Sequence, residues 1–341
     1  MYRIVQVGVG GYGGSWLSTI MDSDRARHVA LIDIDADNLE RARQVTGVNQ
    51  SACFFSLEEA ISKMEADALL CVVPPVNHEE VIKAGLSAIL HVLSEKPIAH
   101  TLESAHRIVT YAQAKDRIFM ISQKARFHPW VRRFQQIAND GEIGQVSHMT
   151  HYFRAPYYSW GEFRHKMLDP LFIEMSIHHF DLIRALLGRN PVSVWADSWN
   201  TPHSQFFGDI IGIAHFTMEN GFPVTYHADA ISSGDMTDWY GEIRVVGETG
   251  TLTMLYPDLY IGRKGADHGN RNAPREEVMP VSSPQEGQSA AFEEFLGAIE
   301  NRRIPESNGI DNLNSLAMVF AAIDSSRDQT IKQIPDYLLP E

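Results

Sequence analysis

The sequence predicts two α/β domains: an N-terminal doubly wound parallel sheet, and a C-terminal domain with a large, mostly antiparallel open sheet plus helices. Over residues 1–122, short apolar segments alternate with segments of helical periodicity, which is typical of β-α-β units. Over residues 123–341, longer alternating segments are separated by turn signals, which indicates antiparallel strands. We therefore expect a domain boundary after residue 122.

The N-terminal domain is expected to contain parallel strands joined by helices. Its strand segments are continuously apolar, as in a sheet covered on both faces; they are Ile4–Val7, Val29–Ile32, Ala68–Val73, Ile89–Leu93 and Arg117–Ile121. The helical segments are Asn38–Thr46, Leu57–Met64, Asn77–Gly85 and Leu102–Lys115. In the third of these helices, Asn77 and Glu80 fit a capping box and Gly85 fits a helix end.

The C-terminal domain is expected to combine one-sided strands with a buried helix. The strand segments are Val146–Phe153, Val192–Ser198, Ile210–Met218, Val224–Ile231, Glu242–Val246 and Thr251–Leu255. Pro170–Leu187 is apolar on almost every side, which predicts a buried helix with Asp169 as N-cap and Gly188 beyond its end. Residues 262–288 are polar and rich in Gly and Pro, which predicts a loop. Two further helices close the chain, over Ser289–Asn301 and Asp311–Arg327.

A glycine-rich turn follows the first predicted strand. It has the pattern Gly-x-Gly-x-x-Gly, and the second strand ends at Asp33, about 20 residues later. Such glycines let backbone N–H groups approach a pyrophosphate at a helix N-terminus, and Asp33 is placed to accept hydrogen bonds from an adenosine ribose. The alternative is a plain glycine turn with a solvated Asp. The sequence favours a Rossmann-type dinucleotide site formed by Gly8, Gly10, Gly11, Tyr12, Gly13 and Asp33.

The residues around Asp33 also bear on the choice of cofactor. A carboxylate accepts the 2′-hydroxyl of NAD and repels the 2′-phosphate of NADP. Two more acids and no Arg or Lys follow within Asp33–Asp37. NAD is therefore the expected cofactor, and NADP is the less favoured one.

Composition excludes several classes of protein. The 341 residues carry a formal net charge of −14, which argues against nucleic acid or an anionic membrane as partner. Cys53 and Cys71 are the only cysteines, so neither a disulfide scaffold nor a thiolate zinc site is expected. There is no apolar run of about 18 residues for a membrane span and no signal-peptide pattern. We expect a cytoplasmic protein.

Polar groups follow the third and fourth predicted strands, at the carboxyl edge where such sheets bind ligands. The segments are Pro74-Pro75-Val76-Asn77-His78 and Ser94-Glu95-Lys96-Pro97. Each alone also fits a solvated loop with a proline stop. Together they predict the nicotinamide end of the site, formed by Pro74, Asn77, His78, Glu95, Lys96 and Pro97.

The buried helix carries a narrow polar stripe. Glu174, His178 and Asp181 are spaced by four and three residues and so share one face. Buried carboxylates need partners, so one interpretation is a structural hydrogen-bond network. The other is a cavity lining in which Glu174 orients His178 as a general base. Without further ligands at suitable spacing no metal is expected, and His179, on another face, is expected to be structural.

Other polar side chains are candidates for contact with a small polar substrate. They are Arg126, His151, Tyr152 and Arg164, in addition to Lys96, Glu174 and His178. Each of the four also fits an ordinary surface or packing role.

With these residues in view, the chain resembles the glucose-fructose oxidoreductase / inositol dehydrogenase / rhizopine-catabolism (Gfo/Idh/MocA) family over nearly its whole length. The resemblance is carried by the glycine turn, Asp33, Asn77-His78, Glu95-Lys96-Pro97 and His178-His179-Phe180-Asp181. Glu-Lys-Pro followed later by His-x-x-Asp is more specific than the glycine pattern alone.

The resemblance implies nicotinamide-dependent oxidation of a secondary alcohol on a sugar, cyclitol or related polyol, or the reverse reduction. It implies that Lys96 is the catalytic lysine, that His178 is the catalytic histidine and that the peptide before Pro97 is often cis. It also implies a homodimer or homotetramer formed through the open face of the C-terminal sheet. Members with a catalytic triad often carry Asp four residues before the histidine, where this chain has Glu174.

The working hypothesis is that His178 removes the hydroxyl proton while Lys96 hydrogen-bonds the same oxygen, with the two roles open to exchange. Glu174 would hold the imidazole tautomer. Two other classes stay open: an NAD-recycling glycosidase or eliminating enzyme on the same scaffold, and a non-catalytic NAD-sensing regulator.

Overall fold

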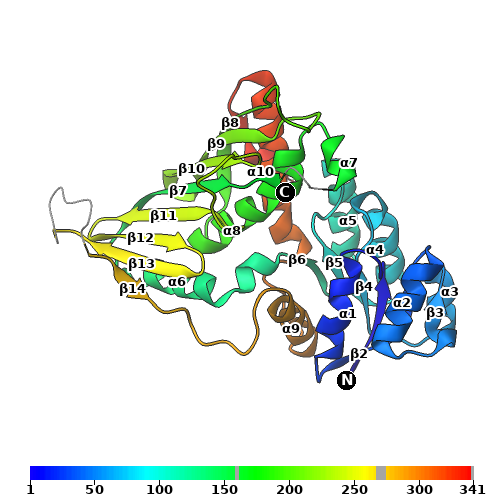
Figure 1. Ribbon diagram of the computed structural model, residues 1–341. Helices are drawn as coiled ribbons and strands as arrows, with labels where there is room; N and C mark the ends of the chain where they lie inside the picture. Colours follow the sequence, from blue (N-terminus) through cyan, green and yellow to red (C-terminus); the bar gives the residue numbers. More distant parts are fainter. Residues whose placement is uncertain (158–160, 266–273, 339–341) are drawn as a thin grey trace. The chain divides into compact units, whose positions relative to one another are not determined.

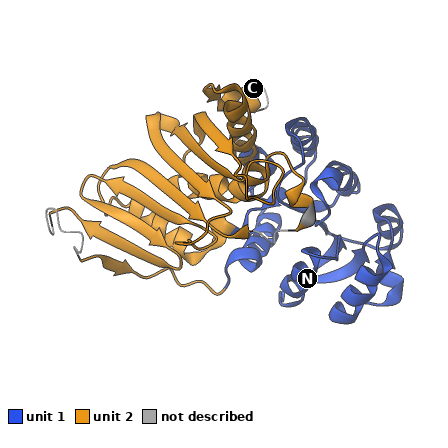
Figure 2. Ribbon diagram, turned by 45° about the horizontal axis from the view of Figure 1, so that its top comes forward, with its two compact units in different colours: residues 1–124, 285–313 blue, residues 125–284, 314–341 orange. Residues whose placement is uncertain are grey.

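The computed structural model describes three stretches of the chain, residues 1–157, 161–265 and 274–338. By its internal contacts the chain divides into two compact units, coloured blue and orange in Figure 2. Unit 1 comprises residues 1–124 and 285–313, and unit 2 comprises residues 125–284 and 314–341. No helix within the described stretches is both long and apolar enough to cross a membrane.

Unit 1 is built on a parallel sheet, of which β4, β5 and β6 are labelled in Figure 1. In its described residues the sheet has six strands in the order β3-β2-β1-β4-β5-β6. The strands are β1 (Tyr2–Val7), β2 (Ala26–Ile32), β3 (Cys53–Phe54), β4 (Ala68–Cys71), β5 (His91–Glu95) and β6 (Phe119–Ser122). The doubly wound fold is confirmed, with the order reversing between β1 and β4. The sequence missed β3, since two residues are too few to show a period.

The helices of unit 1 cover this sheet. They are α1 (Gly13–Met21), α2 (Ala36–Thr46), α3 (Leu57–Lys63), α4 (His78–Ser87), α5 (Leu102–Gln113) and α9 (Gly287–Glu300), with a 3-10 turn η2 (Pro75–Asn77) before α4. α1 contacts α2 and α9, and α4 contacts α5.

The predicted ends of α4 are corrected by the structure. Asn77 stands at the N-cap, but its side chain makes no capping hydrogen bond. α4 continues past Gly85, which lies against β4 and β5: a Cβ there would meet Leu69 at 3.0 Å and Val92 at 3.2 Å. Gly85 therefore lets the helix approach the sheet and does not end it.

Residues 285–313 belong with unit 1, although the sequence boundary after residue 122 assigns them to the second domain. Two hydrogen bonds join Ser307 to Ile121 of β6. The N–H of Ile121 donates to the carbonyl of Ser307 at 2.9 Å, and the hydroxyl of Ser307 donates to the carbonyl of Ile121 at 2.7 Å. On α9, Glu293 accepts from the Arg25 guanidinium at 2.6 Å. These contacts join segments far apart in sequence, which local patterns do not report.

Unit 2 is built on a mixed sheet of nine strands within its described residues, in the order β14-β13-β12-β11-β7-β10-β9-β8-β15. The strands are β7 (Val146–Arg154), β8 (Pro191–Trp199), β9 (Ile211–Met218), β10 (Phe222–Asp229), β11 (Glu242–Gly247), β12 (Gly250–Leu255), β13 (Asp258–Arg263), β14 (Glu276–Val278) and β15 (Lys332–Gln333). β7 and β10 are parallel and the other neighbours antiparallel. β14 corrects part of the loop predicted over 262–288, of which 266–273 lie outside the described residues.

One face of this sheet is covered and the other is open. On β7, His151 and Phe153 are buried, whereas Tyr152 between them is 37% exposed. The helices of unit 2 are α6 (Pro129–Asn139), α7 (Glu162–His165), α8 (Ile177–Leu187) and, from residue 314 on, α10 (Gly309–Asp328). α8 packs on the buried face, where the rings of His179 and Tyr226 lie 5.7 Å apart.

The helix predicted over Pro170–Leu187 has two parts. Leu171–Ser176 is a π-helix, and it continues into α8. Asp169 does not cap it, because its carboxylate pairs with Arg327 at 2.6 Å. Gly188 ends α8 in the left-handed conformation, as predicted, with φ 59°.

Buried histidines are held neutral in both units. The Nε2–H of His28 donates to the side-chain amide oxygen of Gln6 at 3.0 Å, and the Nε2–H of His179 donates to the Trp239 backbone carbonyl at 2.9 Å. Burial lowers the pKa of each imidazole from 6.5 to about 4.

Folding stability should therefore fall in mild acid. In the unfolded chain the two imidazoles take up a proton near pH 6.5, whereas in the folded chain they do so only near pH 4. The stability that the neutral histidines allow is therefore complete above pH 6.5 and is lost as the pH falls from 6.5 to about 4. The loss is about 3 kcal/mol per histidine. Calorimetric Tm values measured from pH 7.5 to 4 should decline, and the decline should be shallower in His28→Leu. A Tm independent of pH over this range contradicts the prediction.

Candidate functional site

The glycine turn between β1 and α1 brings a helix N-terminus directly against the end of a strand. Gly8 has φ 85°, and a Cβ there would lie 2.3 Å from the Val72 carbonyl oxygen that follows β4. A Cβ on Gly13 would lie 2.2 Å from the Gly8 carbonyl oxygen. Both positions therefore require glycine, because any side chain would separate α1 from the sheet.

Asp33, at the end of β2, binds this turn. Its Oδ2 accepts from Val9 N–H at 2.9 Å and Gly10 N–H at 3.1 Å. Its Oδ1 accepts from Asp35 N–H at 3.0 Å and the Asn38 side-chain amide at 3.3 Å. Partial burial acts to raise the pKa of Asp33, but these hydrogen bonds outweigh it and hold the pKa below its usual range.

Two amide groups of the turn stay available for a ligand. Among the described residues, neither Gly11 N–H nor Tyr12 N–H has a hydrogen-bond acceptor. Gly11 has φ 50°, and a Cβ there would meet nothing within 4 Å. Two donors beside open space at the start of α1 fit a diphosphate, which is the group such a helix end binds.

Gln6 is a site residue that the sequence analysis missed, because it read Ile4–Val7 as an apolar strand. Gln6 is fully buried in β1. Its amide Nε2 donates to the Gly8 carbonyl at 3.1 Å and the Gly13 carbonyl at 2.8 Å. The one available signal was the polar residue itself, two positions before the first glycine of the motif.

In the loop after β4, Pro74 and Asn77 are exposed, whereas His78, the first residue of α4, is buried. The His78 ring faces three backbone carbonyls: Nδ1 lies 2.9 Å from Pro97 O and 3.1 Å from Ile98 O, and Nε2 lies 2.9 Å from Val73 O. Burial lowers the pKa of His78 against the opposing effect of these carbonyls. His78 thus links the loop after β4 to the loop after β5.

Glu95 and Lys96 end β5 at the same edge. The buried Glu95 carboxylate accepts from the Trp16 indole N–H at 3.0 Å, and burial raises its pKa. Lys96 is half-buried, and the Lys96–Pro97 peptide is cis. Glu95 therefore anchors the turn that presents Lys96.

In unit 2 the three residues of the predicted polar stripe, Glu174, His178 and Asp181, have different neighbours. Glu174 lies in the π-helix, is 8% exposed and accepts from Arg164 Nε at 3.1 Å. His178, on α8, is half-buried and lies with its ring 5.6 Å from that of Trp239. Arg164 and Glu174, ten residues apart in sequence, are thus brought together.

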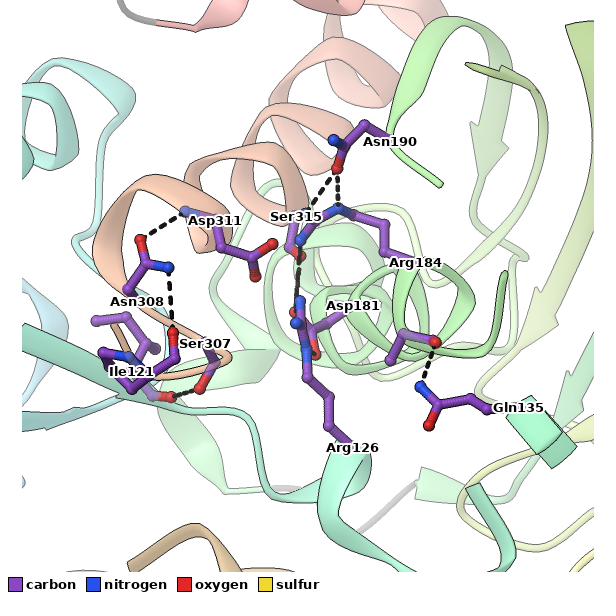
Figure 3. A network of polar contacts seen from close by, with 12 residues as sticks. Ile121, Arg126, Gln135, Asp181, Arg184, Asn190, Ser307, Asn308, Asp311 and Ser315 are labelled. Carbon is purple, nitrogen blue, oxygen red and sulfur yellow. Dashed lines mark hydrogen bonds and ion pairs between the residues drawn. The ribbon is translucent and has the colours of Figure 1, made fainter. Parts of the chain in front are cut away.

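Asp181, the third member of the stripe, belongs to a buried network (Figure 3). Its carboxylate accepts from Arg126 at Nε and Nη2, each at 2.6 Å, and from the Ser315 hydroxyl at 2.8 Å. Ser315 also accepts from Arg184 at 2.9 Å, and Arg184 in turn donates to Asn190. For Asp181 the structural interpretation is the right one. Arg126, a candidate substrate contact, has two donors committed to this network.

The two candidates on β7 face opposite sides of the sheet. The buried His151 donates Nε2–H to the Tyr240 carbonyl at 2.8 Å, and its ring lies 4.8 Å from that of His179. Tyr152 lies on the open face, 6.1 Å from the His227 ring. Because successive side chains of a strand alternate, these two residues cannot line one site. Within the described residues no group of His, Cys, Asp or Glu has the geometry to hold a metal ion.

Comparison with known families matches both halves of the chain. Residues 2–123 match the Gfo/Idh/MocA oxidoreductase family, NAD-binding Rossmann fold, and residues 135–334 match the C-terminal alpha/beta domain of the same family.

Sequence relatives include named dehydrogenases. The uncharacterized protein y4oX of Sinorhizobium fredii, to which no activity is assigned, is 28% identical over 96% of this chain and 94% of its own. The D-apiose dehydrogenase of Paraburkholderia graminis is 24% identical over 94% of this chain and 87% of its own. The inositol 2-dehydrogenase of Corynebacterium glutamicum is 30% identical, over 56% of each chain.

Solved structures share the fold at low identity. An oxidoreductase from Agrobacterium radiobacter in complex with NAD+, L-tartaric acid and magnesium has a TM-score of 0.87 and 16% identity over 99% of both chains. The WlbA dehydrogenase from Bordetella pertussis in complex with NADH and UDP-GlcNAcA has a TM-score of 0.78 and 22% identity, over 100% of this chain and 99% of its own.

The Arg126–Asp181 pair should stabilise unit 2 through burial. Arg126→Met leaves the Asp181 carboxylate buried without its two shortest hydrogen bonds, so the free energy of unfolding should fall by about 3–5 kcal/mol. The double variant Arg126→Met/Asp181→Leu should lose less. Urea denaturation measures both. Arg133→Met, which breaks a more exposed pair with Glu142, is the control and should cost at most about 1 kcal/mol. Equal losses in Arg126→Met and Arg133→Met contradict the prediction.

Proposed function

The chain belongs to the Gfo/Idh/MocA family of oxidoreductases, and from this membership we propose that it oxidises a secondary alcohol of a sugar, cyclitol or related polyol, or catalyses the reverse reduction, with NAD. The observation that carries the proposal lies within unit 1. The unpaired amides of Gly11 and Tyr12 and the side chain of Lys96 follow β1 and β5 at one carboxyl edge of the sheet. A dinucleotide whose diphosphate bound the Gly11 and Tyr12 amides would extend along this edge, where Lys96 lies.

The proposed cofactor contacts use groups that suit each part of NAD. Gly11 and Tyr12 N–H would bind the diphosphate, and the Asp33 carboxylate would accept from the adenosine ribose while repelling a 2′-phosphate. Pro74, Asn77 and the Glu95-Lys96-Pro97 turn would border the nicotinamide. When bound, NAD supplies the hydride acceptor for the reaction.

The proposed chemistry uses Lys96 and His178. In the version we favour, His178 would remove the hydroxyl proton of the substrate and Lys96 would stabilise the developing negative charge, and the two roles are open to exchange. Glu174, held by Arg164 at 3.1 Å, would stabilise the imidazolium. Arg164 would also bind substrate hydroxyls.

We also propose a cytoplasmic homo-oligomer. Cys53 and Cys71 are free thiols, in keeping with a reducing compartment. The open face of the nine-stranded sheet exposes large aromatic side chains, Tyr152, Trp195 and Trp199. Such a face is suited to pairing with a second copy of the chain.

A panel of sugars, cyclitols and sugar acids, each incubated with NAD+ or NADP+, tests the function through the absorbance of the reduced cofactor. Stoichiometric NADH formation with one substrate class supports the proposal. Substrate conversion without net NADH indicates the cofactor-recycling enzyme instead. Tight NAD+ binding without turnover of any substrate indicates a regulator.

Lys96 and His178 should carry the chemical step. Lys96→Ala and His178→Ala should each lower kcat by about two to four orders of magnitude and leave NAD+ affinity largely unchanged. Lys83→Ala, which removes a lysine paired with Glu79 on α4, is the matched control and should retain activity. Near-normal turnover in both active-site variants argues against the assigned chemistry.

Glu174 should act through His178. Glu174→Gln keeps the shape but cannot stabilise an imidazolium, so kcat should fall and the pKa that governs the pH–rate profile should decrease. Glu174→Asp keeps the charge, so activity should survive in part. Steady-state rates from pH 5 to 10 measure both effects. Full activity in Glu174→Gln together with a lower Tm would leave Glu174 only a structural role.

A further inference from the structure

We propose that Gln6 is a positioning residue for the diphosphate-binding turn, and that His28 sets the orientation of its side-chain amide. This inference rests on the proposed function, since it assumes that the turn binds a dinucleotide. Neither residue belongs to the glycine motif or to the expected cofactor contacts.

Gln6 uses every polar atom of its side chain within the protein. The two amide hydrogens match two acceptors, the carbonyls of Gly8 and Gly13, and the amide oxygen accepts from His28 at 3.0 Å. A fully buried amide costs several kcal/mol unless its donors and acceptor are all satisfied. An apolar residue would suit this buried position in β1 equally well. We therefore relate the amide to the two carbonyls of the turn that it binds.

The two carbonyls that Gln6 binds lie at the two ends of the turn. Gly8 is its first residue and Gly13 begins α1, and the unpaired amides of Gly11 and Tyr12 lie between them in sequence. One rigid side chain that donates to both ends fixes the start of α1 relative to the end of β1. The direction of the two unpaired N–H groups is thereby fixed before a ligand arrives, which is how preorganisation raises affinity.

His28 determines which way round the Gln6 amide stands. An amide can exchange its oxygen and nitrogen by rotation, and only one orientation directs both hydrogens at the turn. His28 lies on the neighbouring strand β2, and its Nε2–H is a donor. Of the two ends of the Gln6 amide, the oxygen can accept from this donor and the nitrogen cannot. The imidazole is neutral at physiological pH because burial lowers its pKa to about 4, and a neutral ring with Nε2 protonated supplies this donor.

The inference predicts a change in cofactor affinity that is separate from stability and from chemistry. Gln6→Met has nearly the same volume but donates no hydrogen bond, so the Kd for NAD+ measured by calorimetric titration should rise about 10-fold or more. Turnover at saturating NAD+ should stay within about threefold of the unaltered protein, because Gln6 touches no reacting group. His28→Leu should raise the Kd less, by about 3- to 10-fold, and the double variant should bind like Gln6→Met alone.

Ile4→Ala is the matched control. Ile4 lies two residues earlier on the same face of β1, is equally buried and has no contact with the turn among the hydrogen bonds of the described residues. The variant should be destabilised at least as much as Gln6→Met and yet keep its NAD+ Kd within about twofold.

Several outcomes overturn the inference. The inference is overturned if Gln6→Met binds NAD+ as tightly as the unaltered protein. It is also overturned if Ile4→Ala raises the Kd for NAD+ as much as Gln6→Met does. If Gln6→Met fails to fold, His28→Leu decides, and an unchanged Kd in that variant overturns the inference. If the unaltered protein binds no NAD+, the proposed function fails and the inference fails with it. Binding by the unaltered protein with no effect of either variant removes the inference alone.

Discussion

The hydrogen bonds from Val9 and Gly10 N–H to the Asp33 carboxylate are the interaction on which the rest of the site depends. They divide the backbone donors of the glycine turn into two sets: Val9 and Gly10 N–H are satisfied within the protein, whereas Gly11 and Tyr12 N–H have no acceptor among the described residues. The carboxylate keeps its charge because its four donors depress its pKa. Asp33 therefore shapes the turn as well as being the proposed ribose contact, so a substitution there should disturb both the turn and the proposed contact.

Other residues along the carboxyl edge of the sheet also bind groups of the protein itself. Gln6, His78 and Glu95 are buried polar residues whose atoms bind backbone carbonyls or an indole N–H. Each of the three side chains holds an adjoining turn in place by these hydrogen bonds and so fixes the position of the residues in that turn. Lys96, between the anchored Glu95 and the Pro97 carbonyl held by His78, stays half-buried at the edge. The buried polar residues at this edge therefore support the turns, whereas the more exposed Lys96 is the one that we propose to act on a ligand.

Local sequence signals predicted the fold class but not the long-range pairing. The strand–glycine–helix pattern and the spacing to Asp33 are local, so β1, α1 and β2 follow from sequence. β3 and β14, at two and three residues, carry no period, and residues 285–313 join unit 1 only through contacts with segments far away in sequence. Arg164 was a candidate, but nothing in its local sequence indicated that it pairs with Glu174. Patterns report periodicity, whereas pairings depend on which surfaces folding brings together.

The helix stripe shows why equal spacing did not mean equal role. The rule that buried carboxylates need partners was sound, and both acids have them. Asp181 is bound by Arg126, 55 residues earlier in the chain, whereas Glu174 is bound by Arg164. The π-helix adds a second reason, because its wider turn shifts the face that Glu174 presents relative to the α-helical register of His178 and Asp181. π-helical turns are rare, and those that occur are frequently found at functional sites. One lies here immediately before His178 and contains Glu174, so the irregular turn coincides with the acid that we propose to act through His178.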